Sequence, residues 1–226
     1  MVLKHIFYFI GFIFISLSPM FIVSIMIDIG DNTMPILTSF ICLLILFLFL
    51  LILNFLYTYY KKISRNKFKK IYCKNIINII IMFIGMRFIF MILKLLLEFE
   101  TNDGLTKNDE TLISLDSTNL SVSVVILFAI TIMFISPICE ELIYRGIFHN
   151  MFFKKNILYV FPSLISSFIF SLLHAPTNIV SFLIYFLASL ILYYAYIRRD
   201  NILESIILHI LNNSIYTYYL ILNNLF

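Results

Sequence analysis

Long apolar stretches, separated by short polar connections, dominate the pattern of this chain. Each stretch runs for about 20 residues, the length that an α-helix needs to cross the hydrocarbon core of a bilayer. Lipid offers no hydrogen-bond partners to the backbone, so spanning segments of this kind are predicted to be helical. The fold class is therefore all-α, a polytopic bundle of about seven transmembrane spans. The spans are expected at about 6–27, 35–58, 75–97, 122–153, 158–175, 179–197 and 202–223.

Composition supports the membrane interpretation. Hydrophobic residues make up 62% of the 226 residues and charged residues 12%, whereas about a quarter of a soluble domain is charged. A chain this apolar could not cover its surface with polar groups in water, so we expect a multi-pass protein of the cell membrane in contact with lipids. The first apolar stretch could imitate a signal peptide, but no small-residue cleavage site follows it, so we interpret it as a retained span.

Charged connections alternate in sign along the chain. The basic stretch 61–74, the pair Lys154–Lys155 and the pair Arg198–Arg199 fall on one side of a seven-span protein, and the acidic loop 98–116 falls on the other. Lys and Arg in short loops mark the cytoplasmic side, which predicts a cytoplasmic N-terminus. No basic stripe occurs outside the loops, so nucleic acid is not expected as a partner.

The polar stretch 100–121 divides the chain into two predicted parts. Residues 1–121 are expected to supply membrane helices and a polar external loop. Residues 122–226, with spans four to seven, are expected to form a four-helix catalytic core, because the residues suited to chemistry lie there.

Two adjacent glutamates, Glu140 and Glu141, stand at the end of a long apolar run. A carboxylate at membrane depth is costly unless it is paired, protonated or hydrated. On a helix, Glu141 and Arg145 share a face, whereas Glu140 points about 100° away. Unequal surroundings for two carboxyl groups suit acid–base chemistry. The alternative is that this helix end simply reaches the cytoplasmic headgroups.

Two histidines, His174 and His209, lie inside predicted spans. Phe170 precedes His174 by one helical turn, and Asn213 follows His209 by one turn. A single histidine in a span often does no more than bridge two helices by a hydrogen bond. Two histidines, two glutamates and an asparagine buried in one small bundle are groups that can activate a water molecule and stabilise an oxyanion.

Three motifs occur in order over residues 137–213: Glu140-Glu141-x-x-x-Arg145, Phe170-x-x-x-His174 and His209-x-x-x-Asn213. Together they resemble the signature of the CAAX protease and bacteriocin-processing family, also called the CPBP or Abi family, whose members are intramembrane endopeptidases. The resemblance implies that Glu140 activates the attacking water, helped by His174. It implies that His209 and Asn213 stabilise the oxyanion. The supporting residues would be Glu141, Arg145 and Phe170.

The resemblance also implies the substrate, a membrane-associated peptide or a lipidated C-terminus. The family is often labelled metallopeptidase, and Glu140, His174 and His209 could hold a divalent metal such as zinc, with water as fourth ligand. No His-Glu-x-x-His motif is present, so glutamate catalysis without metal is our first interpretation. A non-catalytic membrane immunity or binding protein is the alternative function. A small transporter is disfavoured because no internal repeat is found.

Depth in the membrane constrains the fifth span. His174 lies further along its span from the basic connection than His209 does, so the two meet only if the fifth helix starts late or tilts. Pro162 suits the first turn of a helix. We therefore predict a helix that begins near Phe161, after a connection at 154–160.

The sequence does not decide the roles of two other polar residues, Cys139 and Arg87. Cys139, beside Glu140, could be a nucleophile, but nothing in the sequence polarises it, and a packing role is preferred. Arg87, in the middle of the third span, could pair with a carboxylate, face a water-filled cavity or reach towards the interface.

Overall fold

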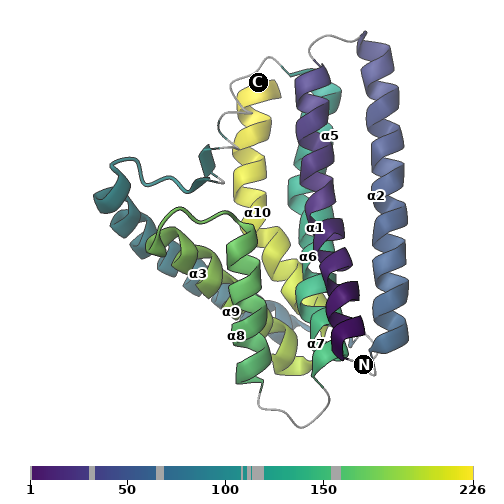
Figure 1. Cartoon of the computed structure of the whole chain (residues 1–226). Coiled ribbons are helices and arrows are strands. Elements are labelled where there is room, and N and C mark those ends of the chain that lie inside the picture. Colours follow the sequence, from purple (N-terminus) through teal and green to yellow (C-terminus); the bar gives the residue numbers. More distant parts are fainter. Residues whose placement is uncertain are drawn as a thin grey trace. The chain divides into compact units, whose positions relative to one another are not determined.

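The computed structural model describes residues 2–30, 34–64, 69–107, 109–110, 113, 120–153 and 159–225. Every regular element in these ranges is a helix (Figure 1). The elements are α1 (Val2–Gly30), α2 (Pro35–Ile63), α3 (Cys73–Thr101), α5 (Val122–Ile130), η1 (Thr131–Ile135), α6 (Ser136–Glu140), η2 (Glu141–Ile147), α7 (Phe148–Phe152), α8 (Val160–Leu173), α9 (Ile179–Arg199) and α10 (Ile202–Leu225). The expectation of an all-α fold is confirmed.

The predicted spans correspond to α1, α2, α3, the continuous helix from α5 to α7, α8, α9 and α10. Within the described ranges, five helices are long and apolar enough to cross a membrane. They are Leu3–Asp28, Pro35–Ile63, Cys73–Thr101, Val122–Phe152 and Ile179–Arg199. α8 is apolar but has only 14 residues, and α10 is not among the five. Large apolar side chains also point outward from the first three helices, for example Phe14, Phe47 and Phe88, as lipid contact requires. The chain is a multi-pass membrane protein.

The helix Val122–Phe152 carries both glutamates and contains two π-helical sections, η1 and η2. Pro137 is the second residue of α6, two positions after the end of η1. Proline has no N–H group, so the carbonyl one turn earlier loses its usual helical partner, and a helix commonly widens or kinks at such a point.

The described helices cluster into two compact units. The first, which we call the glutamate unit, comprises Met1–Arg65, Leu115–Phe152 and Ile210–Phe226. The second, the histidine unit, comprises Asn66–Ser114 and Phe153–His209. Both units contain segments from before and after residue 121. The predicted division into residues 1–121 and a catalytic core at 122–226 stays a prediction.

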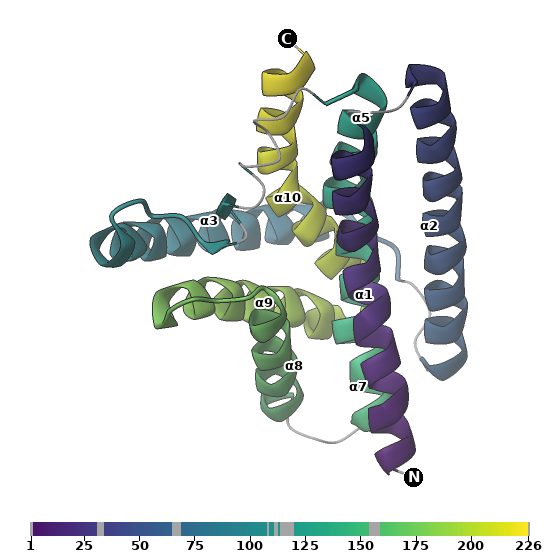
Figure 2. The ribbon, with the colours of Figure 1, turned by 45° about the horizontal axis from the view of Figure 1, so that its top comes forward.

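In the glutamate unit, α1 and α2 run lengthwise beside the helix from α5 to α7 (Figures 1 and 2). The Ser16 and Tyr144 hydroxyl oxygens lie 2.6 Å apart in a buried hydrogen bond between α1 and η2. The Ser39 hydroxyl of α2 likewise lies 2.6 Å from the Ser123 hydroxyl of α5. These contacts fix the helix that carries the glutamates at two levels.

In the histidine unit, α9 packs against both α3 and α8 (Figure 2). The Ser171 hydroxyl donates to the Phe182 carbonyl over 2.7 Å, which joins the end of α8 to α9. Asn178 caps α9 by accepting from the Ser181 N–H over 2.8 Å. The short connection between the two helices is therefore closed by its own hydrogen bonds.

The fifth predicted helix starts late, as expected. α8 begins at Val160, one residue before the expected Phe161, with Pro162 in its first turn. The expected connection is described only at Tyr159, which forms a turn, because residues 154–158 lie outside the described ranges.

Candidate active site

Glu141 and Arg145 form the ion pair that their spacing predicted. Glu141 Oε1 lies 3.1 Å from Arg145 Nη1, and both side chains are fully buried. Each charge offsets the desolvation of the other, and either one left alone there would be strongly destabilising. Glu140, the last residue of α6, is half-buried. The two adjacent carboxylates therefore differ in their surroundings.

The two carboxylates also lie where the helix changes from α to π geometry, since Glu140 ends α6 and Glu141 begins η2. π-helical turns inside α-helices are rare and are frequent at functional sites. Gly146 in η2 lets α2 approach closely, because a Cβ atom there would lie 2.8 Å from Cδ2 of Tyr60. The sequence analysis did not single out Gly146 or Tyr60.

Asn213 lies in the glutamate unit, on α10. Its Nδ2 donates to the carbonyl oxygen of Ile132, in η1, over 3.0 Å. Its Oδ1 accepts from Nδ2 of Asn212 over 3.2 Å. Both Nδ2 and Oδ1 of the Asn213 amide therefore take part in hydrogen bonds. The bond to Ile132 uses one of the two N–H groups of Nδ2. Asn212 was not found from the sequence.

His174 is the C-cap residue of α8, in the histidine unit. Its Nδ1 lies 2.8 Å from the carbonyl oxygen of Phe170. A carbonyl can only accept, so Nδ1 carries the hydrogen and the neutral ring has its lone pair on Nε2. The imidazole also stacks on the ring of Tyr185, with centroids 4.5 Å apart. Tyr185 carried no signal in the sequence.

His209 is buried on α10. Its ring meets the buried ring of Phe170 edge-on, with centroids 6.2 Å apart, and Phe170 contacts His174 with centroids 4.4 Å apart. The histidine unit thus brings Phe170, His174 and His209 together around one aromatic side chain. The glutamate unit holds the other predicted residues: Glu140, Glu141, Arg145 and Asn213. Convergence of the two sets on one cavity stays a prediction.

The sequence did not decide the roles of Cys139 and Arg87, whose surroundings differ. Cys139 is fully buried, as a packing residue would be. Arg87 is half-buried, and its guanidinium carbon lies 5.6 Å from the centroid of the Phe90 ring. A cation over an aromatic face gains electrostatic energy, most of all where water is scarce.

A metal has no matching ligand set in the part of the chain that the structure describes. No three His, Cys, Asp or Glu side chains there are grouped so that they could hold an ion.

The chain is thus a multi-pass, all-α membrane protein whose later helices carry a buried glutamate, Glu141, and a buried histidine, His209. Residues 122–215 match the model of a family described as type II CAAX prenyl endopeptidase Rce1-like. No curated protein and no solved structure matches the chain. The matched residues contain all three motifs, and over this segment the chain is similar to that family.

Proposed function

We propose that the chain hydrolyses a peptide bond of a membrane-associated peptide or lipidated C-terminus with a water molecule that Glu140 activates. The observation that carries this proposal is the fully buried Glu141–Arg145 pair, whose atoms lie 3.1 Å apart. That pair commits Glu141 to Arg145, and we assign the proton transfer to the neighbouring carboxylate, Glu140. Two neighbouring carboxyl groups with different surroundings can take different roles in catalysis.

The proposed reaction has two steps. Water attacks the carbonyl carbon of the scissile bond while its proton passes to Glu140, helped by Nε2 of His174. The former carbonyl oxygen then carries negative charge, and His209 and Asn213 donate hydrogen bonds to it. The carbon–nitrogen bond breaks as Glu140 returns the proton to the leaving nitrogen, giving a carboxylate and an amine.

The contacts of Asn213 support its proposed part. The bond of 3.0 Å to the Ile132 carbonyl uses one amide hydrogen and leaves a second that can point at a developing oxyanion. A donor that is oriented before the reaction costs no reorganisation in the transition state, and such a donor typically contributes about 10²–10³ in turnover.

We propose further that the N-terminus lies in the cytoplasm. Within the histidine unit, basic residues gather where α3 begins and α9 ends: Lys69 Nζ donates to the Arg199 carbonyl over 2.5 Å. Near the opposite end of α3, three exposed side chains are acidic: Glu98, Glu100 and Asp103. Basic residues mark the cytoplasmic side in short loops, so this separation of charge supports the orientation.

The proposal is tested with purified protein in lipid vesicles and a synthetic peptide that ends in a C-a-a-X sequence with a prenylated cysteine. We expect a C-terminal fragment to be released, with one water added across the two products, as mass spectrometry would show. The same peptide without its lipid is the matched substrate. A protein that binds the prenylated peptide but releases no fragment would support the non-catalytic binding protein instead.

A further inference from the structure

Tyr185 closes one side of an aromatic enclosure around His174. The two rings are nearly parallel, with an interplanar angle of 25° and centroids 4.5 Å apart. Phe170 is tilted by 33° from the imidazole, with centroids 4.4 Å apart. Two rings at these distances and angles cannot share one face of an imidazole, so the ring of His174 lies between them. The hydrogen bond from Nδ1 to the Phe170 carbonyl adds a restraint at the edge.

The far end of Tyr185 is fixed by a loop that follows α3. The Tyr185 hydroxyl lies 2.7 Å from the hydroxyl of Thr106, which is 1% exposed. Thr106 is locked to Asp109 in turn: its N–H donates to Oδ2 of Asp109 over 3.2 Å, and its hydroxyl accepts from the Asp109 N–H over 3.1 Å. This reciprocal pair leaves the Thr106 hydroxyl with little freedom to turn away.

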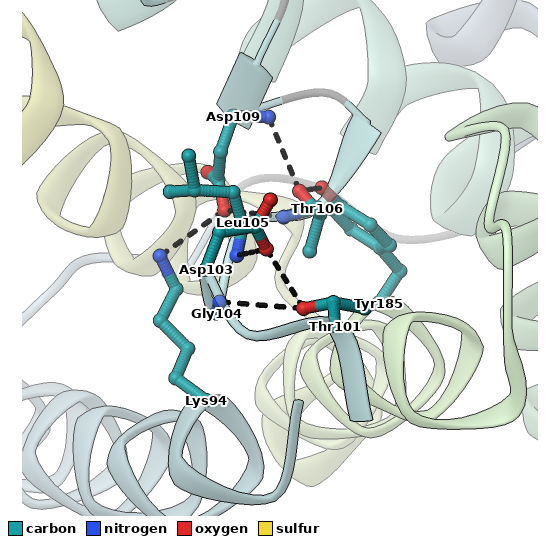
Figure 3. Close-up of polar contacts among 8 residues, drawn as sticks. All are labelled: Lys94, Thr101, Asp103, Gly104, Leu105, Thr106, Asp109 and Tyr185. Atoms are coloured by element: carbon teal, nitrogen blue, oxygen red, sulfur yellow. Dashed lines mark hydrogen bonds and ion pairs between the residues drawn. The ribbon is translucent and has the colours of Figure 1, made fainter. Parts of the chain in front are cut away.

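The loop is anchored to the end of α3, as Figure 3 shows. Lys94 Nζ lies 3.1 Å from Oδ2 of Asp109. The Thr101 hydroxyl donates to Asp103 over 2.7 Å, and the Leu105 N–H donates to the same oxygen over 3.1 Å. These two donors, led by the Leu105 N–H, hold the pKa of Asp103 below its usual range, so the carboxylate stays charged at neutral pH.

We propose that Tyr185 is a positioning residue for His174, and that the segment after α3 holds Tyr185 in place through Thr106 and its partner Asp109. The proposal rests on the proposed function, because it matters only if His174 assists water activation. A ring restrained on both faces keeps Nε2 in one direction, and a displacement of about 1 Å in a catalytic group can cost about 10²-fold in rate. Tyr185 itself transfers no proton.

The proposal gives the first half of the chain a part in the site. Thr101–Asp109 precedes the segment 122–215 that matches the family, and the sequence analysis assigned it only to an external loop. The segment after α3 would therefore influence the turnover of the enzyme, although it contains none of the three motifs.

Kinetics on the prenylated peptide test the proposal. Tyr185→Leu removes both the stacking and the hydroxyl, and we expect kcat to fall by about 10- to 100-fold while KM stays within about twofold. Tyr185→Phe keeps the stacking but loses the hydrogen bond to Thr106, so an intermediate loss of turnover is expected. Thr106→Val, a change outside the aromatic enclosure, should give an intermediate loss. The matched control is Tyr194→Leu, at an exposed tyrosine of the same helix, with wild-type turnover expected.

A spectroscopic measurement separates this proposal from the proposed function. In a Glu140→Gln background, 15N-labelled histidine should report His174 with hydrogen on Nδ1 and with ring-current shifts that Tyr185→Leu removes. If Tyr185→Leu removes these ring-current shifts but the wild-type protein cleaves no peptide, the proposed function is refuted, whereas the contact between Tyr185 and His174 stands. Unchanged signals, or equal kcat in Tyr185→Leu and wild type, would overturn the proposal. An equal loss in Tyr185→Phe and Tyr185→Leu would also overturn it, since stacking would then have no part.

Discussion

Arg145 neutralises Glu141 across one turn of a π-helical section, with Nη1 and Oε1 3.1 Å apart and both side chains fully buried. The pair supports our proposal that Glu141, rather than Glu140, is the structural one of the two adjacent carboxylates. It also explains why a charged residue is tolerated in a helix that is otherwise apolar, since a buried charge is stable only with its partner.

Removal of the cation should therefore reduce folded protein. Arg145→Ala leaves Glu141 buried and unpaired, at a cost of about 3–5 kcal/mol. We expect less protein in the membrane and a lower thermal unfolding midpoint in detergent. Arg145→Ala combined with Glu141→Gln should recover part of the loss, because no buried charge remains. Wild-type stability in Arg145→Ala alone would show that the pair is not structural.

Gly146 gives a second stability prediction. Gly146→Ala places a Cβ atom 2.8 Å from Cδ2 of Tyr60, so α2 must shift, at a cost of about 1–3 kcal/mol. The matched control is Gly85→Ala in α3, where nothing lies within 4 Å of the added atom, and where alanine should be neutral or stabilising by up to about 1 kcal/mol. The thermal unfolding midpoints of both variants, compared with that of the wild type, measure these two effects. Equal midpoints would contradict the close approach of α2.

Asn212 should act through Asn213. Asn213→Ala removes a proposed oxyanion donor and should lower kcat by about 10²–10³-fold with little change in KM. Asn212→Leu removes the bond of 3.2 Å to Asn213 Oδ1 and should lower kcat by a smaller factor, about 3- to 10-fold, equivalent to the net worth of one hydrogen bond. Steady-state kinetics on the prenylated peptide measure both. A larger loss in Asn212→Leu than in Asn213→Ala would reverse the two roles.

Topology can be tested with a native cysteine. Cys73 is exposed beside the basic stretch, whereas Cys42 and Cys139 are buried. In intact cells a membrane-impermeant maleimide should leave Cys73 unlabelled, and it should label Glu100→Cys in a background where Cys73 is serine. Inverted vesicles should give the opposite pattern. Labelling of both positions from one side would mean that the number of spans between them is even.

The long helices and the local pairs were predictable because they depend on near neighbours in the sequence. Hydropathy alone identified the helices, and a separation of four residues predicted the contact between Glu141 and Arg145 and that between Phe170 and His174. The late start of α8 followed from Pro162 and from the need to bring His174 to the depth of His209.

The remaining features depend on contacts that no local pattern encodes. The Tyr185 ring reaches His174 only because α9 folds back on α8, and Thr106 reaches Tyr185 across 79 positions of sequence. The π-helical section that begins at Glu141 lies in a helix that packs against both α1 and α2. The contact of Asn213 with Ile132 likewise joins helices that are 81 positions apart.

The central claim is that Glu140, and not Glu141, activates the attacking water. The most direct measurement is cleavage of the prenylated peptide per folded molecule in Glu140→Gln, with folded protein quantified by size-exclusion chromatography and peptide binding measured in parallel. The account predicts that Glu140→Gln accumulates in the membrane and binds the peptide like wild type, yet releases no fragment. Normal cleavage per folded molecule in Glu140→Gln would contradict it, and loss of cleavage in Glu141→Gln alone would assign the base to the other carboxylate.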